Sequence, residues 1–164
     1  MANSSGSAGA ELALILPFVL ILILGTLEGG HYMYLEHKVA KGVRDGARYA
    51  ARLAFSNYDC ASNTISSAAL TQIRNITRTG FPDGDNPVFG GTDNPVISGW
   101  TSGNVTAALN CATAQGGLYA ATSGNAPRVR VNASVPYPAL FIGSTIDPST
   151  IRLRAVAESA VMGI

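Results

Sequence analysis

The chain has 164 residues, a formal net charge of +1 and charged side chains at only 13% of its positions. This length suits one domain, or a small domain with an anchor, and the near-neutral charge gives no electrostatic basis for nucleic-acid binding. Pro, Gly, Ser, Thr and Asn are plentiful after residue 56, which favours turns and short strands over a helical bundle.

The first predicted element is an apolar helix. Residues 12–24 contain no polar side chain, and the longer stretch 6–27, with Glu11 as its only charge, reaches the roughly 20 residues that a membrane-spanning helix needs. Pro17 lies inside the run, and a membrane tolerates a proline that would break a helix in water. A cleaved signal peptide is the alternative, but residues 25–30 make a poor cleavage site and no Lys or Arg precedes the run.

The helix is predicted to continue as an amphipathic segment over residues 32–55. Apolar side chains recur three and four positions apart on one face, and basic side chains recur in the same way on the opposite face. The apolar face is formed by Tyr32, Leu35, Val39, Val43, Ala47, Ala50 and Ala54, and the basic face by Lys41, Arg44, Arg48 and Arg52. Because no proline separates the two segments, we predict one helix from about Ala8 to Phe55. The basic face is either solvated or in contact with anionic headgroups or an acidic partner.

The remaining chain is predicted to be a small α+β domain. We expect a helix at 64–78, a long ordered loop at 79–104, and strands at 104–112, 117–121, 128–135 and 151–157. Apolar and polar residues alternate in the last two strands, which predicts an antiparallel sheet packed against the apolar face of the long helix. Trp100 in the loop either caps the core or is an exposed recognition residue.

Two cysteines occur, Cys60 and Cys111, too few for a disulfide framework. If the C-terminal region leaves the cytoplasm, we expect one disulfide between them, contributing roughly 2–4 kcal/mol, and two buried thiols are the alternative.

The sequence contains no catalytic constellation that we recognise. His31 and His37 have no convincing ligand cluster beside them, and Asp83, Asp85 and Asp93 depart from EF-hand spacing. Neither a Gly-x-Ser-x-Gly motif nor a phosphate-binding loop occurs. We therefore predict no metal, no cofactor and no enzymatic activity.

Four motifs resemble a known family. Glu11 is followed by Leu-Ala-Leu and then Pro17, residues 25–30 read Gly-Thr-Leu-Glu-Gly-Gly, and residues 46–51 read Gly-Ala-Arg-Tyr-Ala-Ala. Near the C-terminus, residues 129–138 read Val-Arg-Val-Asn-Ala-Ser-Val-Pro-Tyr-Pro. The order of features resembles a type IV pilin, and these motifs resemble the TadE-like family of the tight-adherence (Flp) pilus system. Residues 56–127 carry no motif that we recognise.

The resemblance implies processing by a prepilin peptidase after a glycine, with a glutamate as the fifth mature residue. Gly6 fits this spacing, since cleavage there would make Ser7 the new N-terminus and place Glu11 fifth. Glu11 would then pair with the terminal amine of a neighbouring subunit and set the register of packed helices; an interfacial carboxylate facing headgroup water is the alternative. Helix packing is assigned to Pro17, Gly25, Glu28 and Gly29.

Together with this resemblance, the sequence predicts a type IV pilin-like α+β fold. Residues 1–6 are a candidate leader, 7–55 the long helix with a transmembrane part at about 11–27, and 56–164 an extracytoplasmic head. The expected function is that of a structural subunit, a minor pilin, of a bacterial tight-adherence pilus. A major filament subunit and a membrane-anchored binding module that never polymerises are the alternatives.

The expected partners are other pilin subunits, the prepilin peptidase, the inner-membrane assembly platform and the lipid bilayer, with no nucleic acid. The expected location is the inner membrane, with a single pass and the head outside, and then the pilus at the cell surface.

Overall fold

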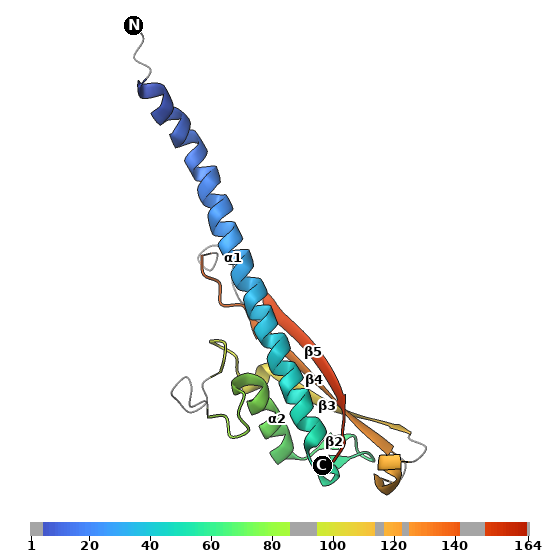
Figure 1. Cartoon of the computed structure of the whole chain (residues 1–164). Helices are drawn as coiled ribbons and strands as arrows, with labels where there is room; N and C mark the ends of the chain where they lie inside the picture. Colours follow the sequence, from blue (N-terminus) through green and yellow to red (C-terminus); the bar gives the residue numbers. More distant parts are fainter. Residues whose placement is uncertain (1–4, 86–94, 114–116, 123–124, 142–149, 164) are drawn as a thin grey trace.

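The computed structural model describes residues 5–85, 95–113, 117–122, 125–141 and 150–163. One helix, α1 (Ser5–Arg52, 48 residues), runs through the whole length of the molecule, about 70 Å at 1.5 Å per residue (Figure 1). Its first half projects from the rest of the protein, and its second half is part of the head. Pro17 lies inside this helix. The long single helix predicted from the sequence is therefore present, ending at Arg52 rather than Phe55.

The head is built on a three-stranded antiparallel sheet in the order β3–β4–β5. Its strands are β3 (Val105–Thr113), β4 (Asn125–Pro136) and β5 (Arg152–Ala160). In the central strand, Val131 pairs with Ala107 on one side and Ala157 on the other. The alternating pattern of β4 sends Val129, Val131, Ala133 and Val135 into the core, all with no exposed surface. The antiparallel sheet predicted from the sequence is confirmed.

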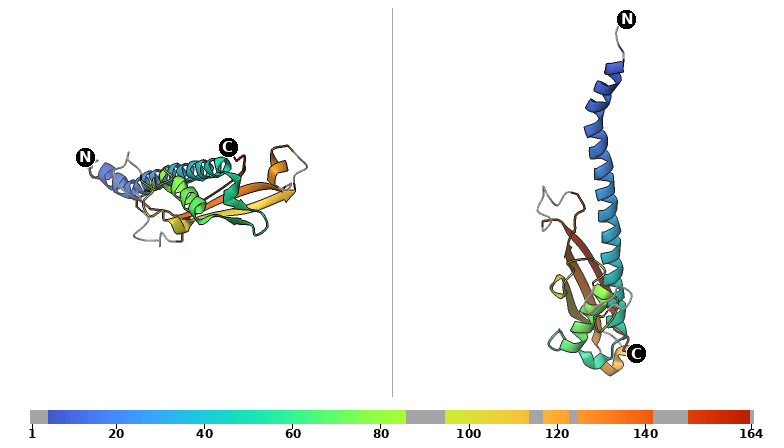
Figure 2. Two further views of the ribbon diagram at one scale, coloured as in Figure 1. Left: turned by 90° about the horizontal axis from the view of Figure 1, so that it is seen from below. Right: turned by 90° about the vertical axis from the view of Figure 1, so that its left-hand side faces the viewer.

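Both helices lie on the same face of this sheet (Figures 1 and 2). The apolar face of α1 supplies Leu35, Val39, Val43, Ala47 and Ala50 to the core. The predicted basic face, Lys41, Arg44, Arg48 and Arg52, is exposed. Helix α2 (Ser67–Thr79) packs beside α1 and contributes Ile73, and Trp100 is buried with 1% exposure. Trp100 is thus a core residue, one of the two roles that the sequence allowed.

Short elements complete the head. A two-stranded hairpin, β1 (Tyr58–Asp59) and β2 (Thr64–Ile65), precedes α2. Within the described residues there are three 3-10 helices: η1 (Phe55–Asn57), η2 (Ser102–Asn104) and η3 (Gly117–Thr122). The side chain of Ser66 caps α2 by accepting a hydrogen bond from Ala69 N, and Gly80, at φ 86°, ends it in the left-handed conformation that glycine favours.

Three sequence predictions were wrong in detail. The strand expected at 117–121 is the 3-10 helix η3, because Gly117 adopts a positive φ of 69° and turns the chain instead of extending it. The helix expected from residue 64 begins at Ser67, because Ser66 caps it and the two residues before pair with β1. Ala54, placed on the buried face, is exposed beyond the end of α1. Much of the predicted loop at 79–104, namely residues 86–94, lies outside the described residues.

Candidate functional site at the junction of helix and head

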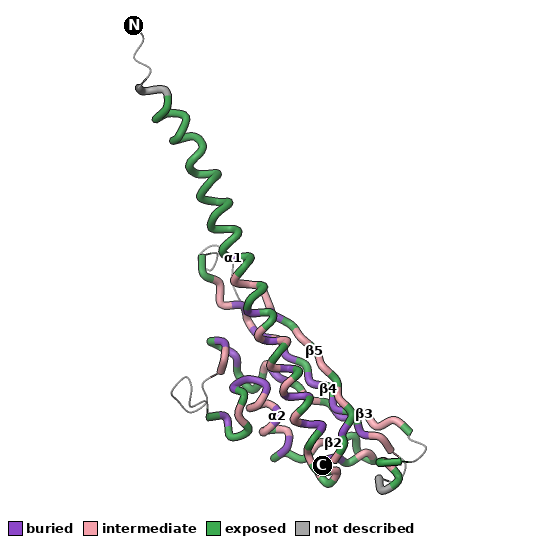
Figure 3. Tube along the Cα trace, in the orientation of Figure 1, coloured by how far each residue is buried: buried purple, intermediate pink, exposed green. Residues whose placement is uncertain are grey.

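The two halves of α1 have different surroundings. Residues 8–27 are exposed without exception, including large apolar side chains such as Leu14 (73%) and Phe18 (70%) (Figure 3). Among the residues of known burial, Glu28 is the first that the head covers, and it is only 5% exposed. The change from an isolated helix to a packed one therefore takes place at a carboxylate.

Three donors from the head meet the carboxylate of Glu28. Oε1 accepts from the Tyr137 hydroxyl at 2.7 Å and from the Leu140 backbone N–H at 3.2 Å, and Oε2 accepts from the Phe141 N–H at 2.9 Å. Both oxygens are used as acceptors, as expected of an ionised carboxylate. Hydrogen bonds to a charged acceptor are stronger than neutral ones, so this side chain fastens the helix to the segment that follows β4.

Tyr137 is the centre of the network on the head. Its hydroxyl also lies 3.1 Å from Nδ1 of His31 and 3.2 Å from the Glu28 carbonyl. A phenol has one proton, and the shortest contact assigns it to the Glu28 carboxylate, so the hydroxyl accepts from His31 Nδ1–H. Burial, together with the hydrogen bond to Glu28 and its negative charge, raises the pKa of Tyr137 well above its ordinary value. The phenol therefore remains a donor throughout the physiological range.

The local sequence explains where Tyr137 lies. Strand β4 ends at Pro136, which interrupts the ladder, and the Tyr137 N–H still bonds the Ile151 carbonyl at 3.0 Å before β5 begins. The tyrosine is 3% exposed, and the ring of Tyr32 packs edge-on against it at 5.3 Å. The Pro-Tyr-Pro sequence thus ends a strand and presents one side chain to α1.

Comparison with known proteins gives two matches that divide the chain at the end of α1. The model of TadE-like proteins matches residues 6–48, and the model of a Tad-like Flp pilus-assembly family matches residues 54–157, more than half of the chain. The chain is a TadE-like member of this pilus-assembly family. No curated protein and no solved structure matches it. Both families are components of pilus assembly, and the exposed apolar helix fits a membrane-anchored protein.

In this TadE-like protein the two matched regions meet at the site just described. Glu28 belongs to the first match and Tyr137 to the second, and their side chains bond across 109 positions of sequence. The sequence had singled out both motifs but had not paired them. The sequence did contain one indication of this pairing. A carboxylate next to an apolar run requires hydrogen-bond donors, and the head must supply them.

The other predicted residues of α1 lie in its exposed first half or directly after Glu28. Glu11, Pro17 and Gly25 are exposed, as is Gly29 directly after Glu28. A Cβ added to Gly25 or Gly29 would meet no atom of the described chain within 4 Å. Gly6 and Ser7 fall within α1, and the match to TadE-like proteins begins at Gly6. Of the assigned packing residues, Glu28 is the one that is buried at the described part of the head.

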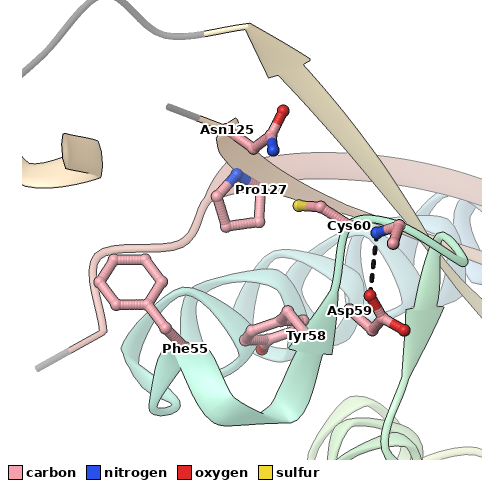
Figure 4. A pocket seen from close by; sticks show the side chains of 7 residues that line it. Phe55, Tyr58, Asp59, Cys60, Asn125 and Pro127 are labelled. Atoms are coloured by element: carbon pink, nitrogen blue, oxygen red, sulfur yellow. Dashed lines mark hydrogen bonds between the residues drawn. The ribbon is translucent and has the colours of Figure 1, made fainter. Parts of the chain in front are cut away.

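A disulfide joins Cys60 to Cys111, with their Cα atoms 5.6 Å apart. It ties the turn between β1 and β2 to the edge strand β3. An open hollow of about 400 Å³ lies beside it, and Figure 4 shows Phe55, Tyr58 and Pro127 around this space. Asp59 also lines it; hydrogen bonds from Ser62 and from the Ala61 N–H lower the pKa of this carboxylate. The hollow brings together no nucleophile and base within the described residues.

Metal-ligating side chains do not cluster in the part of the chain that the structure describes. Asp83 and Asp85 are in that part, whereas Asp93 is outside it. The hydrogen bonds at the junction hold α1 and the described part of the head together.

Proposed function

We propose that the protein is a pilin-like structural subunit, a minor pilin, of a bacterial tight-adherence pilus. The observation that carries the proposal is the exposure of the apolar half of α1. Twenty consecutive residues, 8–27, are exposed, and an apolar helix of that length needs lipid or other helices around it. A filament made of such subunits supplies both environments in turn, first the membrane and then a bundle of neighbouring helices.

The junction at Glu28 supports this role mechanically. A subunit drawn out of a membrane carries the load from its helix to its head, and the buried carboxylate joins the two by hydrogen bonds to Tyr137, Leu140 and Phe141. Glu11, near the start of the apolar run, is proposed to pair with the terminal amine of a neighbouring subunit after cleavage behind Gly6.

The disulfide supports an extracytoplasmic head. Disulfides form and persist in oxidising compartments, and Cys60 and Cys111 are both in the head. The proposed topology is a single pass through the inner membrane with the head outside. A prepilin peptidase and the inner-membrane assembly platform would act on the subunit before it enters the pilus.

Intact-protein mass spectrometry tests the proposal directly. The chain would be isolated from native membranes and, separately, from filaments sheared off the cell surface. We expect a species that begins at Ser7 in both fractions. An unprocessed chain confined to the membrane would refute the pilin proposal and favour the anchored module that does not polymerise.

A further inference from the structure

Two exposed apolar side chains stand at the junction with no role in the network. Leu140 is 54% and Phe141 is 47% exposed, although the backbone N–H groups of both residues bond Glu28. The chain leaving β4 forms the end of the head nearest to the free half of α1 (Figure 1). Two adjacent large apolar side chains whose backbone N–H groups are held by Glu28 are a costly feature in water unless a partner covers them.

The position of this pair along α1 can be calculated from the helix. Residues 8–27 rise about 30 Å, which equals the thickness of the hydrocarbon core of a bilayer. Glu28 follows directly, so its carboxylate is at the boundary between acyl chains and headgroups. Since side chains on a helix lean toward its N-terminus, the carboxylate leans toward the membrane. Phe141 N is 2.9 Å from Glu28 Oε2, and its residue therefore lies at the same boundary.

We propose that Leu140 and Phe141 are a second membrane contact, inserted into the boundary region of the bilayer beside α1. The inference rests on the proposed placement of residues 8–27 in lipid. Burial of apolar side chains would drive the insertion, whereas an unpaired backbone N–H would oppose it. Both N–H groups are already paired with Glu28, so these two donors can enter a region of low polarity without losing hydrogen bonds to water.

Beyond Glu28, α1 carries side chains that suit the headgroup side of the same boundary. Tyr34 is 57% exposed, and Nζ of Lys38 lies 4.6 Å from the centre of its ring. The backbones of these residues are about 9 Å and 15 Å beyond Glu28 along the helix, and their side chains lean back toward the headgroups, where Tyr and Lys favour an apolar stem and a wet tip. A lone helix rotates freely about its axis; a helix with a second contact on one side does not, so the pair would fix the rotation of the subunit.

Quenching of tryptophan fluorescence by brominated lipid tests the contact. The native chain has one tryptophan, Trp100, which is buried and gives the baseline. Three variants of the full chain would be reconstituted in phosphatidylcholine–phosphatidylglycerol vesicles with bromine on the acyl chains. Phe141→Trp reports the proposed contact, Phe18→Trp reports the spanning helix, and Leu118→Trp, at another exposed position beside the far end of α1, is the matched control.

We expect Phe18→Trp to be strongly quenched. The fluorescence that Phe141→Trp adds to the Trp100 baseline should fall roughly twofold or more, as for a side chain about 5–10 Å into the interface. Leu118→Trp should show no loss. If Phe18→Trp is quenched and Phe141→Trp matches Leu118→Trp, the second contact is refuted while the membrane placement stands. If Phe18→Trp is not quenched either, the placement itself is wrong. If the tryptophan of Phe141→Trp is shielded from solvent only in assembled filaments, lipid is refuted as the partner that covers this pair, and a neighbouring subunit is indicated instead.

Discussion

Glu28 is a single charged residue at the boundary between the exposed part of α1 and the part that packs against the head. Its side chain comes directly after an apolar segment, where an unpaired carboxylate would be costly, and the head covers it with three donors. Removing the charge while keeping the shape is the most direct way to measure what this arrangement contributes.

We expect Glu28→Gln to weaken the attachment of the head. The amide places an NH2 group where an acceptor is needed, so one of the donors Leu140 N–H, Phe141 N–H and Tyr137 O–H loses its partner. A buried donor left without a partner costs about 1–3 kcal/mol. Hydrogen exchange should become faster at the Leu140 and Phe141 amides, and the urea midpoint of the head, followed by the emission of Trp100, should fall.

Glu36→Gln is the matched control, since Glu36 is on the same helix and exposed. It should leave both the exchange rates and the urea midpoint unchanged. Equal behaviour of the two variants would contradict the assignment of Glu28 as the anchor of the head.

Sequence reasoning reached part of this site. The Gly-x-x-Glu-x-Gly and Pro-Tyr-Pro motifs were visible, and Glu28 was assigned to packing. Its partner was not found, because Tyr137 is 109 positions away and a hydrogen bond at that separation depends on the tertiary fold. His31, dismissed as a metal ligand, turned out to lie 3.1 Å from the Tyr137 hydroxyl, a contact that its sequence neighbours do not reveal.

At the scale of elements, the success of prediction followed the strength of the hydrophobic pattern. The long helix and β4 have many apolar positions at one period, and both were found with small errors at their ends. The hairpin β1–β2 was missed because strands of two residues each are too short to show alternation. For the same reason, residues 117–121 were predicted as a strand, although they belong to the 3-10 helix η3.

The crossing of α1 and α2 depends on glycine. A Cβ at Gly42 would collide with the Thr77 carbonyl and approach the Trp100 ring to 2.9 Å. Overpacking against a backbone carbonyl outweighs the higher helix propensity of alanine, and we expect Gly42→Ala to lower the stability of the head by about 1–2 kcal/mol. Urea unfolding monitored by Trp100 measures the change.

A glycine-to-alanine substitution at an uncrowded position of α1 separates the steric effect at Gly42 from the effect of helix propensity. A Cβ at Gly30 would meet no described atom within 4 Å, so Gly30→Ala should be neutral or stabilising by up to about 1 kcal/mol. Losses of equal size at Gly42 and Gly30 would show that the close approach of α2 is not the cause.

The disulfide links elements that share few other contacts. It closes a loop with a sequence separation of 51, and the loss of chain entropy in the unfolded state predicts a stabilisation of about 4 kcal/mol. Replacing Cys60 and Cys111 together by serine should lower the urea midpoint, and adding reductant should shift the native protein but leave the double variant unchanged. If reductant leaves the urea midpoint of the native chain unchanged, this result would contradict a stabilising role of the disulfide.

At the scale of the whole molecule, the protein has two solvation requirements. The head has an apolar core that is buried within the chain, whereas residues 8–27 expose their apolar side chains and require surroundings from outside. A single copy in water satisfies only the first requirement. The sequence predicted this division from the all-round apolar character of the first half of α1 and the one-sided pattern of the second.

Glu11 separates a filament subunit from a protein that is only anchored. A carboxylate in an apolar helix end is costly in hydrocarbon unless it is paired, and the α-amine of an adjacent processed subunit is a cation suited to that pairing. If helices pack in this way, Glu11→Gln should accumulate normally in the membrane but be absent or strongly depleted in sheared filaments, as quantified by mass spectrometry. Glu36→Gln, which removes a charge from an exposed part of the same helix, should enter filaments as the native chain does. An anchor has no need for the pairing, so equal incorporation of both variants would show that Glu11 does not set the register between subunits.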